Sequence, residues 1–509
     1  MSVRKYIHKN IYRWHRITSL IIAVPVLLWT LSGFLHPVMN SFKPKLASQF
    51  LPAAAIDTGK IKLGLQDALV MHGIKEIYNF RIVKMSAAFY YQIQHEGIDS
   101  LTYISCYNGQ LLPEGDKQYA AYLAKRFLYE TNKHEKKGDH HNAAADISAM
   151  MHPRAGVPPP RANVTDVELV TSFSTEYKKS NVLLPVYKVS FDRGDHIRLY
   201  VETSTDRLAT AVDDKRAWFT KFFALTHSWS FLNDLGIVKH IMIGVVSLLC
   251  FLTSLLGFYV YNISNKKKAT NGSKAWHRLL GNVFVLTTLL YAFSGAWHAF
   301  HKIGDKKEKE IALAHSEFKI PELNLPLADL LKKISKGEKL TNVSIIKMND
   351  DNYWQLYVSK GKEKQKRYIH TKTFEELRDG DIRYGCYLAC LYAGKSYHSI
   401  THTKCLTEFT HQYSMMKKRL PVIEVGFEGK ENYYVETSTG KLSAVTNSLD
   451  KAERFSFSNL HMHHYWEMWF GKENGKTIKN TVLLSSTLGL LLLALTGIAM
   501  YLRRKYRKA

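Results

Sequence analysis

Two stretches of the chain carry one pattern at an offset of 262 residues, and they determine the architecture. Residues 14–39 read WHRITSLIIAVPVLLWTLSGFLHPVM, and residues 276–301 read WHRLLGNVFVLTTLLYAFSGAWHAFH. Each begins with Trp-His-Arg, continues as a long apolar run, and ends in Ser-Gly-x-x-His. About 20 apolar residues form a helix long enough to cross a hydrocarbon core of about 30 Å. Both stretches are therefore predicted to be transmembrane helices, built as copies of one unit.

Two further apolar segments complete a predicted bundle of four transmembrane helices. The predicted spans are residues 17–39, 237–262, 279–301 and 480–502. The short flanks at 1–16, 263–278 and 503–509 contain Lys and Arg but no Asp or Glu, which is typical of the cytoplasmic side. Both termini are therefore expected in the cytoplasm, and the long segments 40–236 and 302–479 outside it.

The formal net charge of +26 is concentrated in those flanks, so membrane orientation explains much of it and no nucleic-acid partner is expected. The outer segments are mildly basic as well. This suits anionic ligands or lipid headgroups, and also an ordinary solvated surface.

The outer segments repeat too, in the same order and orientation, as a tandem parallel repeat. Val201–Thr205 and Val435–Thr439 both read VETST, and Leu-Pro-Val occurs at 184–186 and at 420–422. Helical and alternating patterns predict α+β domains with antiparallel strands. The first copy carries an insertion near 134–165, rich in His, Met and Pro, which is either a plain mobile loop or a site for a soft metal.

Histidines at matched positions suggest a cofactor. His15 and His36 are 21 residues apart, as are His277 and His298. In a straight helix this spacing is about 31 Å and leaves both side chains on one face. Imidazole is an axial ligand of haem iron, so His15 and His277 are candidates for an inner haem b, and His36 and His298 for an outer one.

Two alternatives remain open at this point. His227 and His464 lie just before the second and fourth spans, are taken as equivalents in the repeat, and could ligate the outer haem or contact a substrate instead. The Trp-His-Arg segments could also be interfacial anchors without a cofactor.

The Trp-His-Arg, Ser-Gly, Leu-Pro-Val and Thr-Ser-Thr-Gly-Lys-Leu motifs resemble the PepSY-associated transmembrane helix family, the bacterial iron-regulated membrane proteins. The resemblance extends over nearly the whole chain. It implies a protein of the bacterial inner membrane with two PepSY-like domains outside the membrane. In its siderophore-reductase branch it implies two b-type haems and a ferric siderophore or other ferric complex as the substrate.

The sequence has no nucleotide-binding motif, so the electron donor is expected to be a quinol or a separate cytoplasmic reductase. Two other classes of function are weighed against the reductase. One is a permease for iron or siderophore, since parallel repeats suit transport. The other is a non-catalytic sensor that binds ligands through its outer domains.

Overall fold

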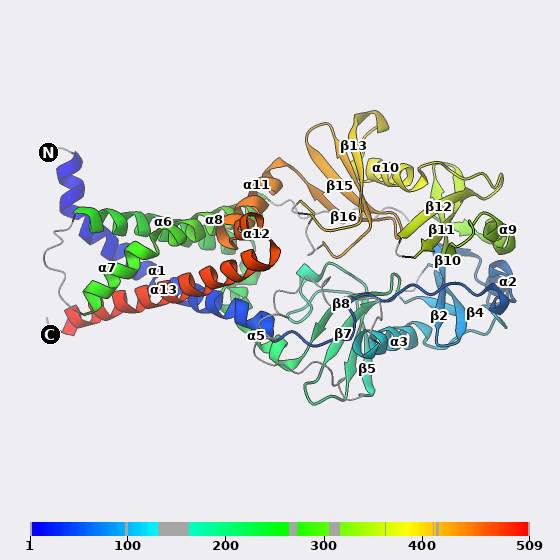
Figure 1. Cartoon of the computed structure of the whole chain (residues 1–509), viewed down its shortest axis with the longest axis horizontal. Coiled ribbons are helices and arrows are strands. Elements are labelled where there is room, and N and C mark those ends of the chain that lie inside the picture. Colours follow the sequence, from blue (N-terminus) through cyan, green and yellow to red (C-terminus); the bar gives the residue numbers. More distant parts are fainter. Residues whose placement is uncertain are drawn as a thin grey trace.

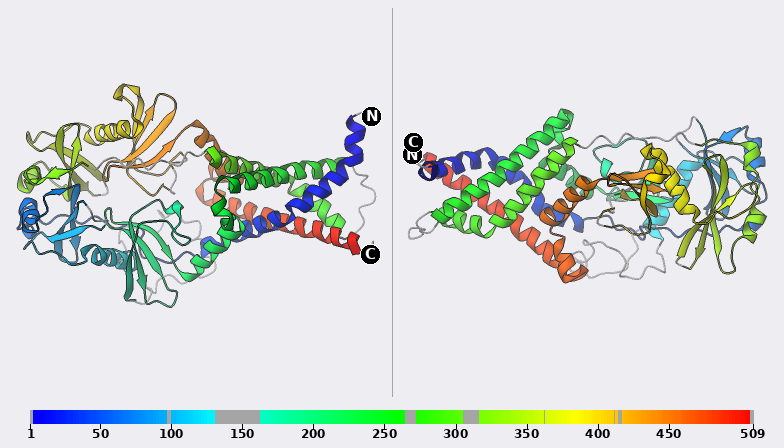
Figure 2. Two further views of the ribbon diagram at one scale, coloured as in Figure 1. Left: turned by 180° about the vertical axis from the view of Figure 1, so that it is seen from behind. Right: turned by 90° about the horizontal axis from the view of Figure 1, so that it is seen from above.

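The computed structural model describes residues 3–96, 100–130, 162–263, 272–304, 316–361, 363–410, 412–413 and 417–506. Long helices form one end of an elongated molecule and β-sheets form the other, with both termini at the helical end (Figures 1 and 2). Of the predicted insertion near 134–165, only residues 162–165 are described.

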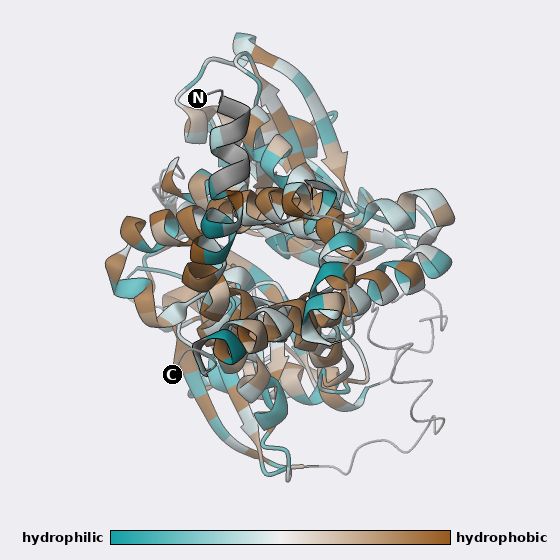
Figure 3. Cartoon of the chain, turned by 90° about the vertical axis from the view of Figure 1, so that its left-hand side faces the viewer, coloured by the Kyte–Doolittle hydropathy of each residue, from teal (hydrophilic) through white to brown (hydrophobic). Residues whose placement is uncertain are grey.

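Three helices are each long and apolar enough to cross a membrane: α1 (Val3–Ser41), α6 (Ile237–Ile263) and α13 (Lys472–Tyr506). Much of their surface is hydrophobic in the view along the bundle (Figure 3). Helix α1 packs against both α6 and α13. The predicted first, second and fourth spans are thus confirmed as helices, and α1 and α13 extend well beyond the predicted limits.

The prediction of one straight helix over 279–301 is wrong. The structure has α7 (Ser273–Val283) and α8 (Val285–Gly304), bent by 63° at Phe284. The Phe284 ring occupies the space that a side chain at Gly489 of α13 would need. The bend falls where this ring packs against α13, and α8 then packs along α6. The distance of about 31 Å and the shared helix face predicted for His277 and His298 require a straight helix, so neither holds for this span.

Outside the helices, each copy of the repeat contains a three-stranded and a four-stranded antiparallel sheet. A helix packs between them, α3 (Gly115–Tyr129) in the first copy and α10 (Gly380–Ala393) in the second. The predicted alternation of helix and strands is confirmed. The strands of the first copy are β2 (Asn79–Met85), β3 (Ala88–Gln94), β4 (Thr102–Ser105), β5 (Val164–Val170), β6 (Val186–Phe191), β7 (Arg198–Glu202) and β8 (Arg207–Val212). Those of the second are β10 (Lys339–Met348), β11 (Asp351–Lys360), β12 (Glu363–His370), β13 (Ile400–Leu406), β14 (Val422–Phe427), β15 (Glu431–Glu436) and β16 (Lys441–Thr446).

The three-stranded sheets of the two predicted outer domains share a hydrophobic core. Phe80 of the first copy packs edge-on against Trp354 of the second, with ring centroids 6.2 Å apart. The Ile82 backbone N–H donates to Asn342 Oδ1 across the same junction (3.0 Å). A short ladder between β1 (Glu76–Ile77) and β9 (Phe318–Lys319) also joins the copies.

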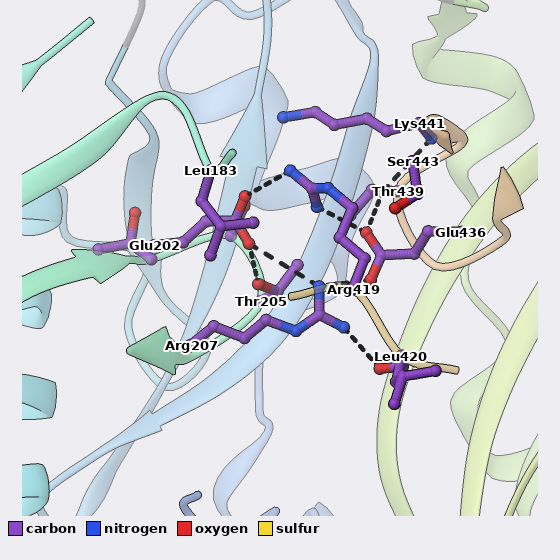
Figure 4. A network of polar contacts seen from close by, with 12 residues as sticks. Leu183, Glu202, Thr205, Arg207, Arg419, Leu420, Glu436, Thr439, Lys441 and Ser443 are labelled. Atoms are coloured by element: carbon purple, nitrogen blue, oxygen red, sulfur yellow. Dashed lines mark hydrogen bonds and ion pairs between the residues drawn. The ribbon is translucent and has the colours of Figure 1, made fainter. Parts of the chain in front are cut away.

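A buried charge network closes the junction nearer the membrane (Figure 4). Arg419 is 3 % exposed and donates to Glu436 (2.7 Å) and to Glu202 of the other copy (3.1 Å). Arg207 pairs with Glu436 and donates to the Leu420 carbonyl oxygen (2.8 Å). Burial alone would raise the pKa of Glu436, but Arg207 and Arg419 lower it to about 2. Both carboxylates therefore stay ionised, and each is neutralised by a cation from the opposite copy.

Candidate functional site

The inner pair of imidazoles is brought together as predicted. His15 of α1 and His277 of α7 face each other with ring centroids 6.4 Å apart. His15 Nδ1 lies 3.2 Å from the Thr253 carbonyl oxygen of α6, and His277 Nδ1 lies 3.1 Å from the Leu493 carbonyl oxygen of α13. A carbonyl oxygen only accepts, so each Nδ1 carries the proton and donates. The Nε2 lone pair of each ring is therefore available as a ligand.

Two glycines set how closely these rings approach the helices. A side chain at Gly257 of α6 would lie 3.0 Å from His15 Cε1, and one at Gly497 of α13 would lie 3.2 Å from His277 Cε1. Each histidine thus packs on a glycine of the neighbouring span. The repeat produces the same arrangement twice, because each copy supplies one histidine and one glycine.

The outer level holds a second facing pair, His227 and His461. His227 follows α5 (Asp214–Thr226), and His461 ends the π-helical turn 457–461 that follows α11 (Ser448–Ser456). Their ring centroids are 6.2 Å apart. His227 Nδ1 lies 3.0 Å from Ser32 Oγ, and His461 Nδ1 lies 3.0 Å from Ser294 Oγ.

The Ser hydroxyls determine the tautomer of the outer pair. Ser32 Oγ donates to the Leu28 carbonyl oxygen (2.8 Å), and Ser294 Oγ donates to that of Tyr291 (3.3 Å). With its proton committed, each hydroxyl accepts from the histidine Nδ1–H, which leaves Nε2 free. The Ser-Gly motifs of the first and third spans thus orient the outer imidazoles.

Burial keeps the outer pair neutral. Burial, with smaller contributions from nearby histidines, lowers the pKa of His227 to about 3 and that of His461 to about 4. Both rings are therefore uncharged at neutral pH, the state in which imidazole ligates a metal.

The other two predicted outer ligands, His36 and His298, are each separated from this pair by one phenylalanine ring. His36 contacts Phe223, which stacks on His227 with ring centroids 4.5 Å apart. His298 contacts Phe457, and Phe457 stacks on His461 in the same way. His36 and His298 thus flank the outer pair and do not form a facing pair of their own.

His464 is not the partner of His227. Its Nδ1 lies 3.2 Å from Glu467 and 3.4 Å from Lys479, and the structural equivalent of His227 is His461. The sequence contained a signal for this. The offset of 234 residues between the VETST segments also relates Phe223 to Phe457 and His227 to His461.

The geometry of both pairs fits a metal held between two imidazoles. With metal–nitrogen bonds of about 2 Å, two such rings have centroids roughly 6 Å apart. Beside the inner pair, Thr253 Oγ1 is buried with no hydrogen-bond partner among the described residues, and so is Trp229 Nε1 beside the outer pair. These are polar groups that a cofactor with carboxylates would satisfy. In the described part of the chain, no group of three or more His, Cys, Asp or Glu side chains could hold a metal ion. Each of the two levels therefore presents two histidine ligands.

The fold is that of a membrane protein with a helical membrane region and a duplicated outer body. The family model described as the PepSY-associated TM region matches residues 12–504, and the chain belongs to that family. No curated protein matches the chain.

Proposed function

We propose that this chain is a haem-containing reductase of the bacterial inner membrane, passing single electrons outward to a ferric complex and releasing ferrous iron. The observation that supports this best is the pair of facing, Nε2-free imidazoles at each of two levels. Haem iron with two histidine ligands is six-coordinate and suited to electron transfer. His15 and His277 would hold an inner haem b, and His227 and His461 an outer one.

The chain's own residues fix the ligands before any cofactor binds. Backbone carbonyl groups orient the inner rings and Ser hydroxyls orient the outer ones, so each Nε2 points away from its hydrogen-bonded side. Such outer-shell hydrogen bonds also raise ligand basicity. The electron would come from a quinol or a separate cytoplasmic reductase. Ferrous iron suits hard oxygen ligands less well than ferric iron, so its complex releases the metal.

The test is the visible spectrum of the purified full-length protein from haem-replete cells. We expect a six-coordinate b-type spectrum and two haems per chain. His277→Ala should remove the inner haem and His227→Ala or His461→Ala the outer one, leaving the other haem reducible. His464→Ala, which removes a nearby histidine that belongs to neither facing pair, is the matched control and should retain both.

Two results would contradict this assignment in different ways. Loss of the outer haem in His36→Ala but not in His227→Ala would show that His36 and His298, and not His227 and His461, hold the outer haem. A colourless wild-type protein would refute the proposed reductase function.

A permease is the second candidate, and the bent third span is the observation that favours it. Transporters bind substrates at broken helices near the middle of the membrane. However, the corresponding first span is one continuous helix, α1, so the break is not matched in the two copies. If the purified protein contains no haem and its proteoliposomes take up radioactive iron, the permease is supported and the reductase is refuted.

A further inference from the structure

A basic pocket lies beside the outer histidine pair, in the first copy of the repeat. It has a volume of about 190 Å³ and includes Lys178, Asn181, Arg216 and Phe223 in its wall. Phe223 is the ring that stacks on His227, so the wall of the pocket is one aromatic ring away from the outer pair. Whatever binds in this pocket is held next to the proposed redox centre.

The cations around the pocket lack carboxylate partners. None of Lys43, Lys178, Arg216 and Lys418 forms a salt bridge with any described residue. Lys178 Nζ donates to the Thr220 carbonyl oxygen (3.1 Å), which leaves ammonium protons free for a ligand.

The nearest acidic groups are already engaged. Glu176, also in the pocket wall, has both oxygens committed to Arg198 and Tyr200. Asp213 accepts from the backbone N–H of Arg216 and caps α5. The charge of Asp213 partly offsets that of Arg216, but Lys43, Lys178 and Lys418 have no paired carboxylate among the described residues, so the pocket keeps an excess of positive charge.

These cations are also close enough to disfavour one another. Burial, and secondarily Arg216, lowers the pKa of both Lys43 and Lys178. Burial lowers the pKa of Arg216 as well. Lys178 and Arg216 are half-buried. Partial removal from water disfavours their charged forms, and a bound anion would offset that cost.

The second copy of the repeat serves as an internal comparison. Arg216 corresponds to Asp450, and Met39 corresponds to His301. In the second copy these two positions are hydrogen-bonded, His301 Nε2 to Asp450 Oδ1 at 2.9 Å, and His298 lies against Glu453. In the first copy Arg216 instead donates to the Met39 carbonyl oxygen (3.4 Å). The first copy thus places a cation where the second has a carboxylate.

We propose that this pocket binds the substrate of the reductase as an anionic ferric complex, held through its carboxylate groups; this inference rests on the proposed function. The guanidinium of Arg216 suits a carboxylate by its geometry, and the Lys178 ammonium adds a point charge. A pocket of about 190 Å³ is smaller than those that enclose drug-sized ligands, roughly 300–1,000 Å³. The ligand is therefore a small chelate or one carboxylate arm of a larger one.

The test measures binding without redox chemistry. Gallium(III)–EDTA is an anionic, carboxylate-bearing complex that cannot be reduced under these conditions. Calorimetric titration with it would use the full-length protein in phosphatidylcholine nanodiscs. Arg216→Gln and Lys178→Gln should each weaken binding about tenfold or more, since each removes a charge-assisted hydrogen bond.

Two control variants separate charge from structure. Arg216→Lys keeps the charge and should retain most of the binding. Lys451→Gln removes one positive charge at the second-copy position equivalent to Ala217 of the pocket wall, and should leave binding unchanged.

A second readout separates this inference from the proposed function. Dithionite-reduced wild-type protein should be reoxidised faster by ferric EDTA than by a cationic ferric trihydroxamate, and Arg216→Gln should abolish that preference. If both complexes reoxidise the protein equally and the variants bind gallium–EDTA like the wild type, the pocket proposal is wrong while the reductase stands. If the protein has no haem band, the reductase fails, and gallium binding still decides whether the pocket takes anionic chelates.

A lipid headgroup is the competing anionic occupant. If gallium–EDTA does not bind, and Arg216→Gln instead lowers the phosphatidylglycerol that copurifies with the protein, the pocket is a lipid site and the proposal is overturned.

Discussion

Replacing Arg419 with Met should destabilise the outer body more than any exposed charge change. Arg419 bridges Glu202 and Glu436, which are 1 % and 0 % exposed, from opposite copies of the repeat. Breaking a buried ion pair by removing one partner costs about 3–5 kcal/mol, since a buried charge is left uncompensated. Arg207 still neutralises Glu436 in the variant, so the lower end, about 3 kcal/mol, is the expected loss.

The assay is thermal unfolding of the purified full-length protein in one detergent and at one scan rate, followed by tryptophan fluorescence. A loss of about 3 kcal/mol should lower the midpoint by roughly 5 °C or more. Arg378→Met, at a side chain 92 % exposed, removes the same charge and should stay within about 0.5 kcal/mol of wild type. The double variant Arg419→Met with Glu202→Gln should recover part of the loss, because it also removes a stranded carboxylate.

A midpoint for Arg419→Met that matches the Arg378→Met control would refute this reasoning. It would mean that the buried carboxylates are satisfied without Arg419 and that the shared hydrophobic core alone joins the copies.

Three further predictions follow from the histidines, the bent span and the basic flanks. Acidification of the haem-free protein from pH 7 to 5 should lower the unfolding midpoint, because the unfolded chain protonates His227 and His461 near pH 6.5 while the folded pKa values are about 3 and 4; a haem-free His227→Gln, His461→Gln double variant should flatten this dependence. Gly489→Ala should cost about 1–3 kcal/mol by displacing the Phe284 ring, whereas Gly281→Ala, where the nearest atom lies 3.6 Å away, should be tolerated, as measured by the same unfolding assay. A reporter enzyme fused after residue 509 should be active only in the cytoplasm, and one inserted near residue 159 only outside; the reverse result would overturn the predicted orientation.

Sequence patterns predicted the features that depend on local periodicity or on the repeat. The apolar runs predicted the spans, and the alternation of residues predicted the strands that lead into the VETST segments. The matched Trp-His-Arg motifs correctly brought His15 and His277 together, because both lie near the same end of equivalent helices.

The outer pair was harder to predict because it depends on tertiary packing. His461 lies in a π-helical turn, and the third span is bent at Phe284, so helical spacing from His277 could not locate the proposed outer ligand. The Arg419 network was equally inaccessible. Glu202 and Glu436 are equivalent positions of the two VETST segments, but nothing in the sequence places Arg419 between them, 217 residues from Glu202.

The duplication itself explains why the proposed centres need both copies. Each facing pair takes one histidine from the first copy and one from the second, so a single copy presents only half of each site. The rings are fixed by equivalent hydrogen bonds in the two copies, which keeps the pairs nearly symmetric. A substrate, however, must approach from one side. The copies differ beside these pairs, with Arg216 in the wall of a pocket in the first and Asp450 hydrogen-bonded to His301 in the second. Under the proposed function both copies supply the haem ligands, and under the pocket proposal only the first receives the substrate.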